Sequence, residues 1–168
     1  MQKLYADWLT RKYGSLEQAH EAWGGVNLAA GSTQVEVPDD WANGKPGFYV
    51  IYLLTSMGQS QGNPRRLSDQ AQFLTEQLRG FFADMAKFYR EELGFQGCIL
   101  ATNWTTAENR TLGALDKYAD MACDMLDRHA YYDTSKGNGG GISPHCFYTD
   151  ESLMKGPDSL TRELRYVG

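Results

Sequence analysis

One stretch decides the predicted fold: Asp124-Met125-Leu126-Asp127-Arg128-His129-Ala130-Tyr131-Tyr132-Asp133. Successive side chains of a strand point to opposite faces, so a strand here would place Asp127, His129 and Tyr131 on one face. Three hydrogen-bonding side chains in a row are unusual for a strand that faces a core. They are typical of a strand that leads into a substrate cleft. The stretch therefore predicts a strand over 124–133 that ends in a polar site.

The residues before this stretch alternate between helical and strand-like patterns. A helix is expected over 67–93, with Ser68 as its N-cap and Gly94 as its stop. Its apolar face consists of Phe73, Leu74, Leu78, Phe81, Phe82, Met85, Phe88, Tyr89 and Leu93. A buried-type strand is expected at 95–102, followed by a short helix around 112–123. The order helix–strand–helix–strand predicts an α/β unit with parallel strands.

The chain is predicted to begin with a pair of helices over 2–23. Gly14 ends the first helix and Ser15 caps the second. The first apolar stripe consists of Leu4, Trp8, Leu9 and Tyr13, and the second of Leu16, Ala19 and Trp23. Residues 24–64 are rich in Gly, Asn, Pro and Ser and show no long period, so we expect a long insertion. Within it, residues 48–55 are expected to form a strand or a short helix.

Length and charge limit the classes of protein and partner. At 168 residues the chain is expected to be a single domain over 1–168, with an irregular C-terminal segment at 132–168. The net charge of −5 and the lack of a Lys/Arg run argue against nucleic acid as a partner. The longest apolar run is about half the length of a membrane span, so no membrane partner is expected. No secretory signal opens the sequence, which makes the cytoplasm the default location.

The cysteine pattern gives no sign of a cofactor. Cys98, Cys123 and Cys146 are odd in number and form no C-x-x-C motif, so neither a disulfide framework nor a zinc site is indicated. His145 stands beside Cys146 without further residues at a metal-ligand spacing. We therefore expect no metal and no other cofactor.

Two predicted strand ends together carry a family resemblance. Thr102-Asn103-Trp104 closes the first strand, and His129-Ala130-Tyr131 closes the second, one βα unit later. This arrangement resembles the middle of the (β/α)8-barrel glycoside hydrolases of clan A, in particular the cellulase- and β-galactosidase-like families. Further similar segments are Trp8-Leu9-Thr10-Arg11-Lys12-Tyr13-Gly14-Ser15-Leu16-Glu17, Ala22-Trp23-Gly24, Arg66-Leu67-Ser68-Asp69-Gln70-Ala71-Gln72-Phe73-Leu74 and Phe81-Phe82-Ala83-Asp84-Met85.

The resemblance implies an incomplete, or broken, TIM-barrel-like unit with few parallel strands and a long helix. It begins after the fourth barrel strand and ends at the sixth. The acid/base glutamate of the clan follows an Asn at the end of the fourth strand, and the nucleophile ends the seventh. Both positions fall outside the match, and no Asn-Glu dipeptide occurs in the sequence. Because retaining hydrolysis needs two carboxyl groups about 5–5.5 Å apart, no catalytic residue is assigned.

The expected partner is carbohydrate. The resemblance implies that His129 and Tyr131 contact the sugar, and Asn103 and Trp104 could hold and stack it. Asp127 lies deeper on the same strand face, where we expect it to hold His129 in one tautomer or to pair with an arginine. Simpler roles also fit, since Asn103 could cap the next helix and Trp104 could belong to the core.

Three functions stay open. The chain could be a glycoside hydrolase-like protein that binds and hydrolyses β-linked plant-type glycosides, a non-catalytic carbohydrate-binding remnant, or an oligomeric fragment without a ligand. An incomplete sheet and a long helix leave apolar surface bare, so a homo-oligomer is expected.

Overall fold

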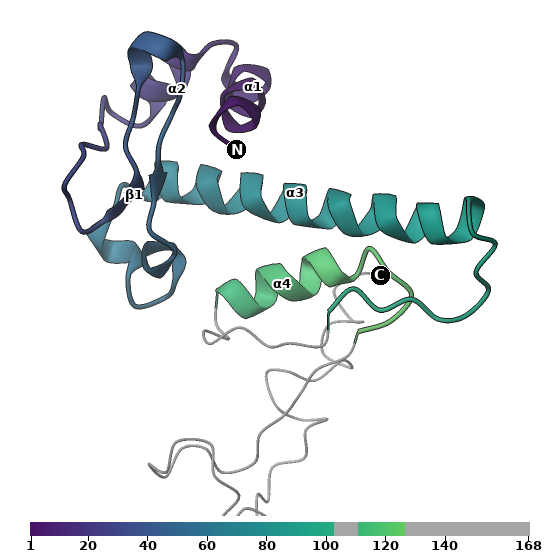
Figure 1. Ribbon diagram of the computed structural model, residues 1–168. Coiled ribbons are helices and arrows are strands. Elements are labelled where there is room, and N and C mark those ends of the chain that lie inside the picture. The colour runs from purple at the N-terminus through teal and green to yellow at the C-terminus, as the bar shows by residue number, and fades with distance from the viewer. Residues whose placement is uncertain (103–110, 127–168) are drawn as a thin grey trace, which may run out of the picture.

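The computed structural model describes residues 1–102 and 111–126. Its elements are α1 (Gln2–Tyr13), α2 (Leu16–Ala22), β1 (Val35–Val37), the 3-10 helix η1 (Trp41–Asn43), β2 (Phe48–Tyr49), the 3-10 helices η2 (Ile51–Leu54) and η3 (Gln59–Gln61), α3 (Pro64–Glu91) and α4 (Leu112–Asp120). The long helix α3 forms the spine. Figure 1 shows α1, α2 and the β-hairpin gathered at the N-terminal end of α3, with α4 lying along the side opposite α1.

The helix pair at the N-terminus confirms the prediction for 2–23. Gly14 ends α1 with a φ of 95°, a conformation that glycine adopts without a steric cost. The side chain of Ser15 caps α2 by accepting a hydrogen bond from the backbone N–H of Gln18. The predicted stripe of α1 was wrong at one position. Leu4 is exposed, and Tyr5 is fully buried in its place, one turn before Leu9.

Helix α3 begins three residues earlier than expected at 67–93. Its N-cap is Asn63, whose side chain accepts a hydrogen bond from the N–H of Arg66, and not Ser68 as predicted. Pro64 suits the first position of a helix because its missing N–H would have no helical partner there. Gly94 has a φ of 64° and lies in the turn that follows the helix.

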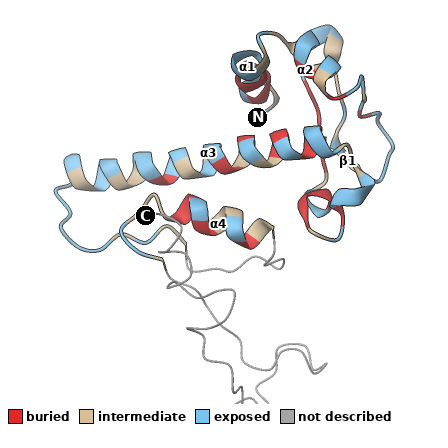
Figure 2. Cartoon of the chain, turned by 180° about the vertical axis from the view of Figure 1, so that it is seen from behind, coloured by how far each residue is buried: buried red, intermediate tan, exposed pale blue. Residues whose placement is uncertain are grey.

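The core consists of two clusters beside the N-terminal half of α3, where Figure 2 shows most of its buried residues. The first cluster is aromatic and surrounds Tyr5, whose ring centroid lies 4.9 Å from that of Phe48 and 4.8 Å from that of Phe73. The buried members are Tyr5, Trp8, Leu9, Ala19, Trp23, Phe48 and Phe73. The second cluster contains Leu28, Tyr49, Leu53, Leu54 and Leu67. Both clusters include residues of the 24–64 segment, so this segment belongs to the core.

The 24–64 segment folds as an antiparallel hairpin of β1 and β2 followed by short helices. The sequence predicted a strand or a short helix at 48–55, and the structure has both, β2 and then η2. Polar side chains of α3 hold the hairpin. The Gln70 side chain accepts a hydrogen bond from the Tyr49 N–H and donates one to the Tyr49 carbonyl, both at 2.9 Å. The Arg66 guanidinium binds the carboxylate of Asp39.

The predicted strand at 95–102 is reduced to a single parallel bridge between Leu100 and Met125. The expectation of a full strand was wrong: in the described residues the pairing consists of this bridge and a backbone hydrogen bond from the Asp124 N–H to the Ile99 carbonyl. The short helix expected around 112–123 is confirmed as α4, which lies against α3. Of the predicted strand 124–133, only the first residues are described. The described chain is thus mixed helix and strand, and it contains no barrel.

Candidate functional site

The five predicted site residues lie outside the described residues. Asn103 and Trp104 fall in 103–110, while Asp127, His129 and Tyr131 fall in 127–168. What the structure does describe is the pair of chain segments that lead to them. These segments meet at the Leu100–Met125 bridge.

An ion pair and hydrogen bonds at Asp124 join the two segments. The side chain of Arg90, near the end of α3, forms an ion pair with Asp124 at 2.5 Å. The same carboxylate accepts a hydrogen bond from the Ile99 N–H at 2.7 Å, and the Asp124 N–H donates to the Ile99 carbonyl. These bonds set the register in which Leu100 faces Met125. The bridge therefore depends on Asp124, the first residue of the predicted strand 124–133.

A second contact joins the first segment to α4. The Thr102 hydroxyl donates a hydrogen bond of 2.9 Å to the carboxylate of Asp120, which is 2% exposed. Cys123 lies close by, and burial, followed by the negative charges of Asp124 and Asp120, raises the pKa of its thiol. The thiolate is therefore disfavoured, and Cys123 is unsuited to act as a nucleophile.

Two buried carboxylates, those of Asp69 and Asp39, stabilise the fold through hydrogen bonds and ion pairs. Asp69 accepts hydrogen bonds from the Tyr13 hydroxyl and the Trp23 indole, both at 2.7 Å, and pairs with Lys12 at 2.8 Å. Burial of Asp39 opposes ionisation, yet hydrogen bonds from Arg66 and from two backbone N–H groups outweigh it and hold the pKa of Asp39 below its usual value. A carboxylate that is kept ionised in this way has no proton to donate as a general acid.

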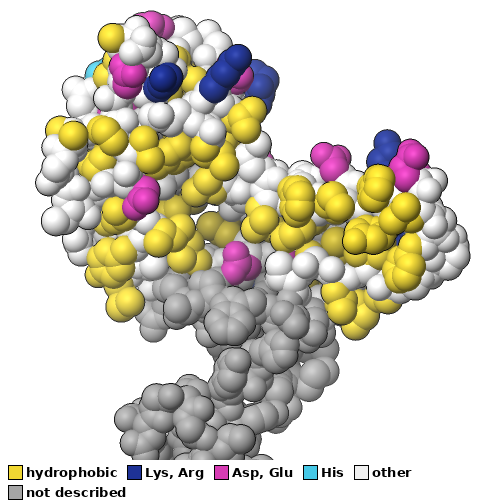
Figure 3. All heavy atoms as spheres, viewed as in Figure 1, with side chains coloured by type: hydrophobic (Ala, Val, Ile, Leu, Met, Phe, Trp, Pro, Cys, Tyr) yellow, Lys and Arg dark blue, Asp and Glu magenta, His cyan; other side chains and the backbone are white. Residues whose placement is uncertain are grey.

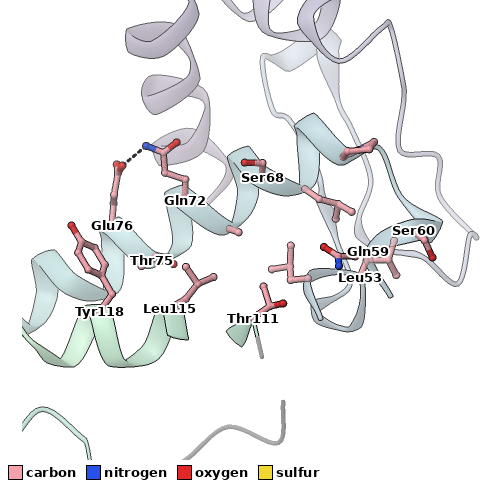
Figure 4. A pocket seen from close by; sticks show the side chains of 14 residues that line it. Leu53, Gln59, Ser60, Ser68, Gln72, Thr75, Glu76, Thr111, Leu115 and Tyr118 are labelled. Atoms are coloured by element: carbon pink, nitrogen blue, oxygen red, sulfur yellow. Dashed lines mark hydrogen bonds between the residues drawn. The ribbon is translucent and has the colours of Figure 1, made fainter. Parts of the chain in front are cut away.

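A groove opens between η2, η3, α3 and α4 (Figure 4). Its volume is about 720 Å³, within the range of small-molecule pockets. The apolar part of its wall is formed by Leu53, Leu54, Leu67, Ala71 and Leu115. Polar side chains on the wall include Gln59, Ser68, Gln72, Glu76, Thr111 and Tyr118. The groove thus offers an apolar surface beside hydroxyl, amide and carboxylate groups.

Hydrogen bonds fix the carboxylate of this groove. One oxygen of Glu76 accepts the indole N–H of Trp8 at 2.6 Å, and the other accepts the amide of Gln72 at 2.7 Å. Among the described residues, Glu76 is the only acidic side chain on the groove wall. In the part of the chain that the structure describes, the groove wall therefore lacks the second carboxylate that a retaining glycosidase needs.

The spacing of polar residues in α3 indicates one wall of the groove, although the apolar residues form the more prominent pattern of this helix. Ser68, Gln72 and Glu76 are spaced four residues apart, which places them on one side of a helix. Tyr118 comes from α4, more than forty residues away, and no local pattern could place it beside them.

No family model matches the chain, and no curated protein or solved structure matches it either. The glycoside hydrolase resemblance thus stays a prediction. Across residues 1–102 and 111–126, no helix is long and apolar enough to cross a membrane.

Proposed function

We propose that this chain is a glycoside hydrolase-like protein, derived from the middle of a (β/α)8 barrel, that binds β-linked plant-type sugars. One observation carries the proposal, the parallel bridge between Leu100 and Met125 with α4 on the connection between them. With α3 before it, this gives the order helix, extended segment, helix, extended segment. That order is the repeating unit of parallel α/β barrels.

The proposed sugar site follows the bridge in sequence on both segments. Asn103 and Trp104 come a few residues after Leu100, and His129 and Tyr131 a few residues after Met125. Sites on parallel α/β folds are built beyond the carboxyl ends of the strands. A neutral imidazole donates one hydrogen bond and accepts another, which suits the hydroxyl groups of a sugar.

Binding is the part of this proposal with the stronger basis. No catalytic carboxylate is assigned from the sequence, and the carboxylates of Asp39, Asp69 and Asp120 are already engaged by neighbouring groups. Hydrolysis of an aryl β-glycoside by the purified chain would establish the enzyme alternative. Binding without turnover would establish the carbohydrate-binding remnant.

Calorimetric titration with cellobiose tests the proposed site. We expect His129→Ala and Tyr131→Ala each to weaken binding by about tenfold, because each removes hydrogen bonds to the sugar. Tyr52→Ala is the matched control, since Tyr52 is exposed on η2. Undiminished affinity in both site variants, with folding verified by circular dichroism, contradicts the proposal.

A second candidate function is self-association through α3. Four apolar residues of α3 follow one another at spacings of three, four and three residues, which is the pattern by which two helices pack side by side. We call this row the seam of α3; it consists of Leu78, Phe81, Met85 and Phe88. Leu78, Phe81 and Phe88 are 38%, 57% and 45% exposed. Figure 3 shows hydrophobic side chains gathered along the C-terminal half of α3. We propose that the same seam of a second copy covers it, as in a two-fold interface.

A further inference from the structure

We propose that the groove between η2, η3, α3 and α4 is a second ligand site, separate from the strand ends, that takes a neutral ring-shaped molecule bearing several hydroxyl groups. A single sugar residue is the representative of this chemical class. The inference rests on the described residues of the groove and not on His129 or Tyr131.

Tyr118 supplies the surface on which a ring can lie. Its side chain lines the groove and is 53% exposed. The Arg79 guanidinium lies 4.5 Å from the centroid of the Tyr118 ring and also donates a hydrogen bond to the Tyr118 carbonyl. The aromatic ring is therefore held in place from its own helix and from α3. A fixed aromatic ring with a polar tip suits the apolar face of a sugar.

Glu76 supplies a preorganised acceptor at the edge of the groove, where its carboxylate points toward α1 (Figure 4). Each of its oxygens already accepts one hydrogen bond, from Trp8 or from Gln72. A carboxylate has about four lone-pair sites, so acceptor capacity remains on both oxygens. Hydrogen bonds from hydroxyl groups to a carboxylate are stronger than those between neutral groups. Two adjacent hydroxyl groups of one ring could therefore be bound together.

Fixed charges of both signs lie at the groove, the carboxylate of Glu76 on its wall and the cations of Lys12 and Arg79 beside Gln72 and Tyr118, so neither sign of ligand charge is favoured. The other polar groups of the wall, such as Ser68 and Gln59, are neutral and can both donate and accept. Together with the apolar part of the wall, they match a molecule with a hydrocarbon face and a hydroxylated edge.

An NMR titration of the full chain with cellobiose tests the inference. In spectra of ¹⁵N-labelled protein, we expect saturable shifts of the backbone amides of Ser68 and Gln72. Tyr118→Ala should weaken the affinity read from these shifts by about tenfold, whereas Tyr118→Phe, which keeps the ring, should retain it. Glu76→Gln should weaken it as well, because the charged acceptor is lost.

The outcomes separate this site from the proposed strand-end site. Loss of the Ser68 and Gln72 shifts in Tyr118→Ala but not in His129→Ala supports the groove site, whatever happens at the strand ends. Loss of all cellobiose binding in His129→Ala, with Tyr118→Ala unaffected, overturns the groove site and leaves the proposed function standing. Shifts at these amides with tetramethylammonium chloride and none with cellobiose overturn the ligand class.

Discussion

The guanidinium of Arg66 and the carboxylate of Asp39 form a two-point ion pair in the interior, with their side chains 0% and 3% exposed. The two distances are 2.5 Å from Nη2 to Oδ1 and 3.0 Å from Nη1 to Oδ2. Arg66 stands in the first turn of α3, and Asp39 stands between β1 and β2. The pair therefore ties the spine of the molecule to the hairpin, and its guanidinium also lies 4.5 Å from the centroid of the Trp23 ring.

Removing one partner of this pair is expected to cost much stability. Arg66→Met keeps the length of the side chain and leaves the Asp39 carboxylate buried without its cation, so we expect a loss of about 3–5 kcal/mol in the free energy of unfolding. Urea denaturation at neutral pH measures it. The matched control is Lys87→Ala, which breaks the exposed pair between Lys87 and Glu91 and should change stability by less than about 1 kcal/mol. Equal losses in both variants would contradict the role given to Arg66.

The lowered pKa of Asp39 predicts a dependence of stability on acid. The unfolded carboxyl binds its proton at a higher pH than the folded one, so the contribution of Asp39 is present above the unfolded pKa and is lost as pH falls through the folded pKa. Wild-type protein should thus lose stability below about pH 4. Asp39→Asn should be less stable at neutral pH and show a smaller further loss in acid. Urea midpoints measured from pH 7 to pH 3 give both slopes, and parallel slopes would exclude Asp39 as a source.

Removing the hydroxyl group is expected to have opposite effects on stability at two buried tyrosines of the core, Tyr5 and Tyr49. The Tyr5 hydroxyl has no hydrogen-bond partner within the described chain, and burial raises its pKa. Tyr5→Phe should therefore leave stability unchanged or raise it by about 1 kcal/mol. The Tyr49 hydroxyl accepts a hydrogen bond from the Asn63 N–H, so Tyr49→Phe should lower stability by about 1 kcal/mol. Thermal unfolding of the two variants side by side is the measurement, and a clear loss in Tyr5→Phe would show that its hydroxyl is bonded.

The start of α3 can be located by mutation. Asn63→Ala removes the N-cap and should cost about 1–2 kcal/mol, since the same side chain also donates to the Trp23 carbonyl. Ser68→Ala lies inside the helix at an exposed position, so its effect should stay within about 0.5 kcal/mol. Denaturation midpoints of the two variants decide between the caps, and the reverse order would move the helix start to residue 68.

The exposed seam of α3 predicts a concentration-dependent assembly. Phe81→Lys places a charge in the middle of the seam and should convert oligomers to monomers in native mass spectrometry at micromolar concentration. Met57→Lys is the control, because Met57 is 69% exposed and lies outside the seam. A wild-type protein that is only monomeric under these conditions would rule out self-association.

The sequence predicts correctly those features that depend only on residues close together in the chain. The helical stripes, the glycine at 14 and the cap at Ser15 could all be predicted because each depends on residues within a turn or two. The start of α3 was missed although Asn63 and Pro64 form a helix-start signal, since the apolar pattern begins only at Leu67.

The rest depends on partners that are distant in sequence. Nothing near Asp39 indicates that its cation is Arg66, twenty-seven residues further along the chain. The same holds for the groove, where Tyr118 of α4 joins Gln72 and Glu76 of α3. A pattern of polar residues along one helix shows a face, but only tertiary structure shows which other side chains that face meets.

The side chain of Gln70 occupies the position of a neighbouring strand. By bonding both the N–H and the carbonyl of Tyr49, it takes up the backbone groups of β2 that a further strand would need. The sheet is thereby closed at two strands on this edge. Growth by edge-to-edge pairing, the usual route from a small exposed sheet to aggregation, is blocked there by a single amide.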